Sequence, residues 1–174
     1  YDRRVLIEKG LEHPIEVNCS VLGFDSEVRT SVTEMPTTSG GELLDFADKY
    51  LTGGGSKGMA SLKRIMPAPV GDEMIHRIES LSAQIFRALD CKGVVRIDYM
   101  LTKNDELYIT EINTIPGSMA FYLWQESGVS YPQLIDKLVE YAEKAFAEKN
   151  ENNYAYTSDI LNGVVLGGKK GGKL

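Results

Sequence analysis

The sequence predicts an α+β fold, an antiparallel sheet with flanking helices, and three observations support this prediction. Two runs of alternating apolar residues, 94–101 and 107–112, flank a polar Lys-Asn-Asp-Glu turn, which is the pattern of a β-hairpin. Residues 73–90 carry an apolar stripe at helical spacing, and residues 131–149 carry another. The chain has 174 residues, 43% of them hydrophobic, which is enough for one ordinary domain with a core.

The first third of the chain is predicted to consist mainly of strands. Residues 4–8 and 15–24 indicate two strands joined by a turn at 12–14, and the alternation over 28–33 indicates another. Residues 43–50 have apolar side chains close to helical spacing and predict a short helix or turn. The glycine-dense run 52–59 has no periodicity, which is typical either of a mobile lid or of a plain flexible linker.

Two helices are predicted in the remainder of the chain. Asp72 follows a proline-rich stretch and is a suitable N-cap for the helix at 73–90. The stripe of that helix consists of Ile75, Ile78, Leu81, Ile85, Phe86 and Leu89. The helix at 131–149 has Pro132 in its first turn, where proline is favoured. We therefore expect one domain at 1–149, followed at 150–174 by a polar, disordered tail that is rich in glycine and lysine near its end.

The pairing within the hairpin follows from the sequence if Asn104 and Asp105 form a two-residue loop. Asp98 then lies opposite Glu111, and Arg96 lies opposite Asn113, with all four side chains on one face. On this face, Met100 is predicted to oppose Ile109 and to form an apolar floor for a flat ring such as adenine. The other face carries Val95, Ile97, Tyr99, Leu101 and Ile112.

Two carboxylates that face each other across a ladder repel, so we expect a cation between Asp98 and Glu111. Oxygen ligands of this kind suit Mg²⁺, which completes its shell with water and substrate phosphates. Asn113 adds a carbonyl oxygen, and Arg96 remains to stabilise negative charge. The alternative is a solvated hairpin in which Arg96 pairs with Asp98 or Glu111, and the spacing of the acidic residues alone favours that alternative.

A longer motif follows the hairpin. The strings RID at 96–98 and EINTIPGS at 111–118 resemble the signature of the D-alanine:D-alanine ligases, which belong to the ATP-grasp superfamily. The resemblance implies an ATP-grasp C-terminal domain and ATP-dependent ligation of D-alanine to a second D-amino acid through an acylphosphate, for peptidoglycan precursor synthesis. The run SMAFYLW at 118–124 departs from the commonest pattern and is similar to the branch with D-alanine:D-serine ligases. The resemblance therefore leaves D-alanine and D-serine open as the second substrate.

The same resemblance implies roles for individual residues. Two Mg²⁺ ions, for which Mn²⁺ could substitute, would be held by Asp98, Glu111 and Asn113. The catalytic positions are Arg96, Gly117, Lys49 and Tyr50, the last two at the entry to a mobile loop at about 50–60. The nucleotide-binding positions are Glu8, Lys9, Leu11 and Glu16, together with Met100 and Ile109. The substrate-binding positions are Gly117, Ser118 and Tyr122, the last aligned with a serine that holds the product carboxylate.

Charge and composition argue against several other classes of protein. The net charge of −6 argues against a nucleic-acid surface, and no apolar run of about 18 residues indicates a membrane span. We expect Cys19 and Cys91 to be free thiols. We expect His13 and His76 to lie at the surface without a catalytic role. The chain begins inside a predicted strand, so we expect it to be part of a longer enzyme. We expect that enzyme to be cytoplasmic and, at full length, homodimeric.

Two alternatives to a D-amino acid ligase remain open from the sequence. Another ATP-grasp carboxylate-amine ligase would share the paired carboxylates but not the EINTIPG string. A non-catalytic nucleotide-binding module would have no physical reason to keep two opposed carboxylates beside Arg96 and Asn113.

Overall fold

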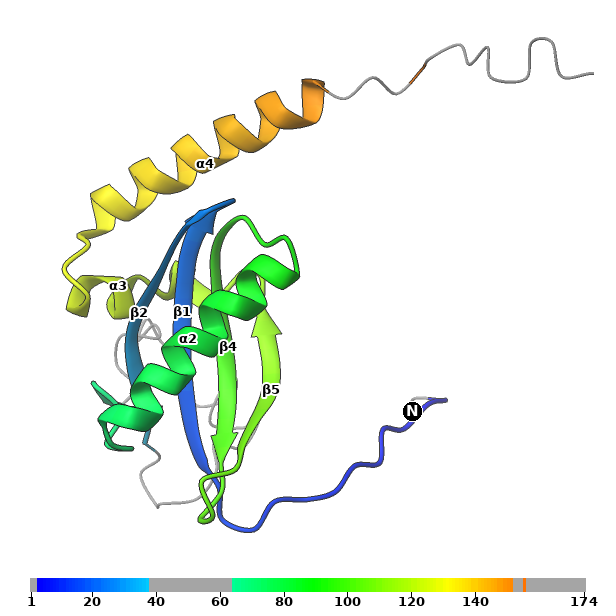
Figure 1. Cartoon of the computed structure of the whole chain (residues 1–174), viewed down its shortest axis with the longest axis vertical. Helices are drawn as coiled ribbons and strands as arrows, with labels where there is room; N and C mark the ends of the chain where they lie inside the picture. Colours follow the sequence, from blue (N-terminus) through cyan, green and yellow to red (C-terminus); the bar gives the residue numbers. More distant parts are fainter. Residues whose placement is uncertain (1–2, 38–63, 152–154, 156–174) are drawn as a thin grey trace, which may run out of the picture.

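The computed structural model describes residues 3–37, 64–151 and 155, which form one antiparallel sheet with helices on both faces (Figure 1). The sheet has the strand order β3-β2-β1-β4-β5, and each pair of neighbours is antiparallel. The strands are β1 (Ile15–Phe24), β2 (Glu27–Pro36), β3 (Arg64–Ile65), β4 (Gly93–Leu101) and β5 (Leu107–Asn113). The helices are α2 (Asp72–Ala88), the short α3 (Phe121–Glu126) and α4 (Tyr131–Glu151). The predicted fold class is confirmed.

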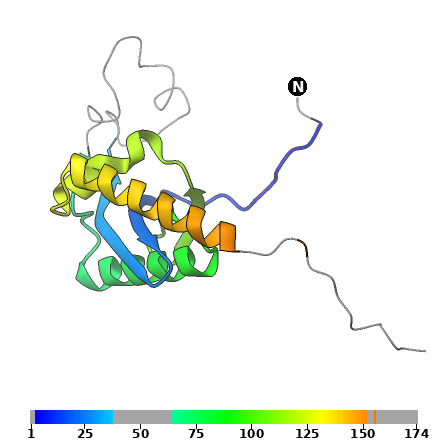
Figure 2. The same cartoon turned by 90° about the horizontal axis from the view of Figure 1, so that it is seen from above.

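The helices divide the sheet into two different faces. Seen from above, α2 lies on one side of the strands, and α3 and α4 lie on the other (Figure 2). The α2 face is apolar and contains Val17, Cys19, Val21, Val95, Ile97 and Tyr99, packed with Ile78 and Phe86 of α2. On the opposite face, one end is covered by packing of Leu22 and Val94 against Trp124, Leu134 and Tyr141. The rest of that face carries the polar residues described below.

The N-terminal stretch differs from the prediction. The strand predicted at 4–8 is wrong, because residues 3–14 contain no strand and β1 begins only at Ile15. Val5, Leu6 and Ile7 are 81%, 82% and 90% exposed, and the stretch runs away from the sheet in both views (Figures 1 and 2). A strand needs a neighbour for its backbone hydrogen bonds, and the described residues provide none there. The strands predicted at 15–24 and 28–33 are confirmed.

The two long helices agree with the prediction except at their ends. Asp72 is the first residue of α2 and not its N-cap, because Gly71 occupies that position with φ 83° and ψ 148°. Asp72 therefore lies in the first turn, where the helix dipole favours a carboxylate. Leu89 was predicted on the apolar stripe, but it follows the end of α2 and is 56% exposed. Pro132 is in the first turn of α4 as predicted.

Two further predictions can be compared with the fold. Cys19 and Cys91 are free, and burial of the Cys19 thiol raises its pKa to about 12, as expected for an inert core residue. No helix in the described ranges is long and apolar enough to cross a membrane. The predicted helix at 43–50, the mobile loop at about 50–60 and nearly all of the tail beyond 151 lie outside the described residues.

Candidate active site

The loop of the β4–β5 hairpin differs from the prediction. It contains the three residues 103–105 and not two, because the Thr102 backbone N–H donates to the Glu106 carbonyl at 2.9 Å. Asp105 ends the loop with φ 60°, a left-handed conformation that aspartate tolerates better than most residues. Leu101 consequently pairs with Leu107. Met100 pairs with Tyr108, so the predicted pairing of Met100 with Ile109 is wrong.

A β-bulge restores the predicted pairing further along the hairpin. Tyr99 pairs with Ile109 and Asp98 pairs with Glu111, which leaves Thr110 as an extra residue in β5. The Thr110 hydroxyl donates to the Asp98 carbonyl at 3.0 Å. The extra residue of the bulge compensates for the extra residue of the loop.

The charged pairs are therefore placed as predicted. Asp98 lies opposite Glu111, and Arg96 lies opposite Asn113. The strands that flank this hairpin extend the row: Glu34 pairs with Asn18, and Asn18 pairs with Asp98. Directly paired residues share a face of the sheet, so a polar row crosses four strands on the face opposite α2.

Asp98 is buried, and two side chains bind its carboxylate. The Arg96 guanidinium donates from Nε to Oδ1 and from Nη2 to Oδ2, both at 2.7 Å, and Asn113 Nδ2 donates to Oδ2 at 3.1 Å. Burial lowers the pKa of Arg96, but the hydrogen bond and charge of Asp98 raise this pKa above its ordinary value. Glu111 is exposed on the same face. The Arg96–Asp98 pair of the alternative interpretation thus forms, but it is buried and not solvated.

A second buried carboxylate, Glu34, was not identified from the sequence. Its Oε1 accepts hydrogen bonds from the Tyr122 hydroxyl at 2.7 Å and from Asn18 Nδ2 at 3.2 Å. Arg64 Nη1 lies 3.4 Å from Oε2, and the Arg64 guanidinium lies 3.7 Å above the centre of the Tyr122 ring. Burial raises the pKa of Tyr122, and so do the charge and hydrogen bond of Glu34, so the hydroxyl stays protonated.

Gly117 and Ser118 begin a turn with an unusual backbone. Ser118, Met119 and Ala120 have φ values of 53°, 56° and 49°, all left-handed. This conformation costs about 1–2 kcal/mol per L-residue, so the surroundings must hold it. Ala120 and Leu123 are fully buried, and the Tyr122 side chain is bound to Glu34. The turn therefore sets where α3 begins.

The polar face can hold a hard metal ion. Asp98, Glu111 and Asn113 provide oxygen atoms from adjacent strands, which are the ligands that Mg²⁺ prefers. Within residues 3–37 and 64–151, no three His, Cys, Asp or Glu side chains are grouped as metal ligands. An ion here would complete its shell with water or with oxygen atoms of a bound phosphate.

The predicted nucleotide-binding residues are only partly brought together. Glu16 pairs with Met100 at the open end of the polar face. Ile109 pairs with Tyr99 and is 46% exposed. The others, Glu8, Lys9 and Leu11, lie in the irregular N-terminal stretch (Figure 1). Lys49 and Tyr50 lie outside the described residues.

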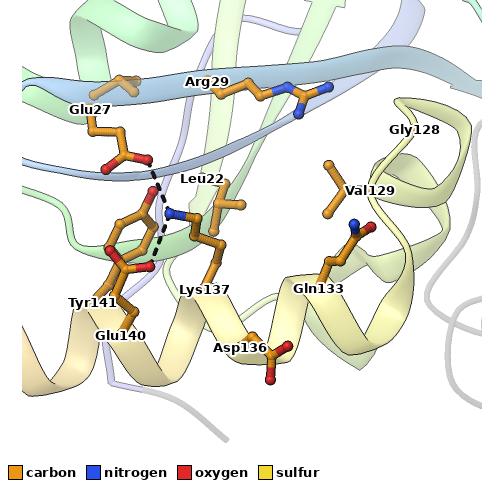
Figure 3. Close-up of a pocket in the computed structure, with 11 residues that line it drawn as sticks. Leu22, Glu27, Arg29, Gly128, Val129, Gln133, Asp136, Lys137, Glu140 and Tyr141 are labelled. Carbon is orange, nitrogen blue, oxygen red and sulfur yellow. Dashed lines mark hydrogen bonds and ion pairs between the residues drawn. The ribbon is translucent and has the colours of Figure 1, made fainter.

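A cavity of about 520 Å³ lies elsewhere, between β2 and α4 (Figure 3). Its lining includes Leu22, Val129 and Tyr141 and none of the predicted site residues. Lys137 Nζ lies 3.4 Å from a Glu27 oxygen and 2.9 Å from a Glu140 oxygen. Because this lysine is already bound to carboxylates, the cavity is better explained as the junction of α4 with the β1–β2 hairpin than as a reaction site.

Known sequences match most of this chain. The D-ala D-ala ligase C-terminus family matches residues 1–140. The D-alanine--D-alanine ligase of Thermosipho africanus is 32% identical over 161 residues, which are 92% of this chain and 42% of that protein. The corresponding ligase of Streptomyces coelicolor is 40% identical over 147 residues, 82% of this chain and 36% of that protein. The chain thus spans about two fifths of the length of these relatives.

Solved structures have the same fold. The D-alanine-D-alanine ligase from Coxiella burnetii has a TM-score of 0.63 and 22% identity, covering 83% of this chain and 36% of that one. The D-alanine--D-alanine ligase from Bacillus anthracis, complexed with ATP, has a TM-score of 0.58 and 20% identity, covering 82% and 42%. The VanG D-Ala:D-Ser ligase from Enterococcus faecalis has a TM-score of 0.56 and 26% identity, covering 76% and 37%.

Proposed function

This chain belongs to the D-ala D-ala ligase C-terminus family, and we propose that it supplies the nucleotide- and metal-binding part of an ATP-dependent enzyme that joins D-alanine to a second D-amino acid. The observation that carries this proposal is the opposed pair Asp98 and Glu111, with Arg96 and Asn113 as the next pair on the same face. Residues 1–149 are proposed as the ATP-grasp part and 150–174 as a tail, with the last turn of α4 extending across this boundary to Glu151. Because the relatives are more than twice as long as this chain, the remainder of the active site is proposed to lie outside these residues.

The polar face provides charge neutralisation for phosphoryl transfer. Asp98, Glu111 and Asn113 are the residues that would hold Mg²⁺, which when bound neutralises the phosphate oxygens of ATP. Arg96, fixed in its cationic form, lies two residues from Asp98, in the next pair on the same face of the hairpin. It can bind the oxygens of an acylphosphate or of the tetrahedral intermediate that follows.

No side-chain nucleophile is required for this chemistry. ATP phosphorylates the carboxylate of D-alanine and leaves ADP. The amine of the second amino acid then attacks the acylphosphate carbonyl, and phosphate leaves as the amine loses a proton. The backbone N–H groups at Gly117 and Ser118 can stabilise the oxyanion formed in that attack. Lys49 and Tyr50 are proposed as further catalytic residues, as the resemblance implies.

The nucleotide is proposed to lie at the open end of the polar face. Glu16 pairs there with Met100, and Met100 pairs in turn with Tyr108. Glu16 can accept hydrogen bonds from ribose hydroxyls, and Met100 with Tyr108 gives the apolar surface that was predicted with Ile109. Binding by Glu8, Lys9 and Leu11 requires the N-terminal stretch to approach this end.

D-alanine and D-serine are both proposed as the second substrate. The run 118–122 departs from the commonest family pattern, and the VanG protein, named a D-Ala:D-Ser ligase, is 26% identical to this chain. The product in either case is a precursor of peptidoglycan, made by a cytoplasmic homodimer. Comparison of ADP release with the two amino acids at equal concentration distinguishes them.

The function is tested in two steps. ADP release by the full-length enzyme should require D-alanine together with Mg²⁺, and the 174-residue chain alone should release none. In calorimetric titration, Met100→Ala should weaken ATP binding about tenfold, because it removes apolar contact area worth roughly 1–2 kcal/mol. ADP release that is indifferent to D-amino acids would refute the ligase proposal while leaving nucleotide binding intact.

A further inference from the structure

Glu34 is two strands away from Asp98 in the same polar row, and it joins three other elements. Its partners are Asn18 of β1, Arg64 of β3 and Tyr122 of α3. The residue is 3% exposed. A buried carboxylate persists only where partners compensate for its lost hydration. Glu34 is therefore one of the points at which α3 is attached to this face of the sheet, and the one that holds its first turn.

The hydrogen bond between Tyr122 and Glu34 has a definite direction. A tyrosine hydroxyl has one proton, and an ionised carboxylate can only accept. The Tyr122 proton is therefore donated to Glu34 Oε1, 2.7 Å away. A substrate carboxylate cannot receive the same proton. Tyr122 consequently differs in chemistry from the serine that holds the product carboxylate at the aligned position.

The attachment of α3 also fixes the strained turn before it. Tyr122 is the second residue of α3, and the left-handed residues 118–120 directly precede the helix. We propose that Glu34 is a positioning residue: by holding the Tyr122 hydroxyl, it fixes the first turn of α3 and thereby the backbone of Gly117 and Ser118 that receives the second D-amino acid. This inference rests on the proposed function, and it adds a residue that contacts no substrate itself.

Steady-state kinetics of the full-length enzyme test the inference. Glu34→Gln and Tyr122→Phe should each raise KM for D-alanine about tenfold, because each removes a charge-assisted hydrogen bond. KM for ATP should not change, since the nucleotide lies at the other end of the face. Glu27→Gln is the matched control: Glu27 is on the same strand, at its far end, and is exposed. It should leave both constants unchanged.

The double variant decides whether the two residues act as one unit. If Glu34 acts through Tyr122, the double variant should have the KM of either single variant. Effects that multiply would overturn the inference, as would a fall in kcat with KM unchanged, which indicates only a loss of folded enzyme. A lower KM in Glu34→Gln would also overturn it, because the freed Tyr122 proton would then bind substrate directly.

A spectroscopic measurement separates this inference from the proposed function. Trp124 is the only tryptophan, is fully buried in α3 and donates from Nε1 to Ser20 Oγ at 3.0 Å. Glu34→Ala should shift its fluorescence emission to longer wavelength, and Glu27→Ala should not. Unchanged emission in Glu34→Ala overturns the inference even in an active enzyme. If the wild-type enzyme releases no ADP in response to D-alanine, the proposed ligase function is overturned. The emission shift then still tests whether Glu34 holds α3 in place.

Discussion

The two faces of the sheet are built from the same strands but from opposite chemistry. Toward α2, alternate residues of β1 and β4 are apolar and wholly buried, as Val17 and Ile97 show. Toward α3, the residues between them are polar: Arg96 forms an ion pair with Asp98, and Asn18 donates a hydrogen bond to Glu34. Both sets have little exposure to solvent. Burial alone therefore does not distinguish a structural face from a functional one.

The difference lies in what each face loses when one residue changes. An apolar core loses contact area and gains a cavity, so its free energy of unfolding falls. A polar face holds like and unlike charges close together. Removal of one charged residue can therefore weaken the binding of a ligand or metal ion and, at the same time, relieve the repulsion between like charges. Substitutions on the α2 face should therefore lower stability more than activity, and substitutions on the polar face should lower activity more than stability.

The largest expected effect is on activity, from Glu111→Gln in the full-length enzyme. Loss of one carboxylate from the opposed pair should lower Mg²⁺-dependent ADP release by orders of magnitude. The melting temperature without Mg²⁺ should be equal or higher, because repulsion with Asp98 is reduced. Glu106→Gln, at the exposed position directly after the loop of the same hairpin, is the control. A large loss of melting temperature in Glu111→Gln would identify Glu111 as a structural ion-pair partner and remove it from the metal site.

The next effect is on stability, from Ile97→Ala on the opposite face of the same hairpin. Ile97 is fully buried against α2 and adjoins Asp98 in β4. Its truncation should lower the free energy of unfolding by about 2–5 kcal/mol, measured by urea denaturation. Ile109→Ala, at a position 46% exposed, should cost much less. If Ile97→Ala abolished activity per folded molecule without destabilisation, the two faces would not be separable.

The smallest effect is a pH dependence of the α2 face. Burial raises the pKa of Cys19 from 9.0 to about 12, and burial also raises that of Tyr99 from 10.0 to about 12. Below pH 9 both groups are neutral in the folded and in the unfolded protein. From pH 9 for Cys19 and pH 10 for Tyr99, up to about pH 12, each group ionises only in the unfolded protein, so the free energy of unfolding falls as the pH rises. Each group contributes a slope approaching about 1.4 kcal/mol per pH unit. Urea titrations at pH 8 and 11 should show a smaller fall in Cys19→Ala; an equal fall would exclude Cys19 as a source.

The fold was predictable wherever strands and helices are set by local periodicity. Residues 73–90 and 131–149 carry clear helical stripes, and the two halves of the hairpin alternate strictly. The strand predicted at 4–8 failed because Val5, Leu6 and Ile7 are consecutive apolar residues, and whether they find a pairing partner depends on residues distant in sequence. The three-residue loop was missed because Asn104-Asp105 is equally compatible with two loop lengths.

The arrangement of the candidate site residues was predictable within the hairpin and not beyond it. Asp98 and Glu111 are partners across one turn, whereas Glu34 reaches Tyr122 across 88 positions. A signal was nevertheless present in β1, where Glu16, Asn18 and Ser20 alternate with Val17, Cys19 and Val21. Polar residues on one side of a central strand indicate that this side faces either solvent or a second layer of polar residues. The sequence alone does not choose between these, because it does not show which elements cover that side.

Thr110 has a consequence for how this hairpin can change over evolutionary time. The loop and the bulge each contain one residue more than a regular two-residue hairpin, and the two additions cancel at Asp98 and Glu111. Loss of one of these residues alone, either from the loop or at Thr110, shortens the chain between the two carboxylates by one residue and still allows Asp98 to pair with Glu111. The sequence distance between the two carboxylates can therefore differ by one among homologues without separating them in space. Homologues with the shorter distance should lack either the extra loop residue or the bulge, and should keep the facing pair.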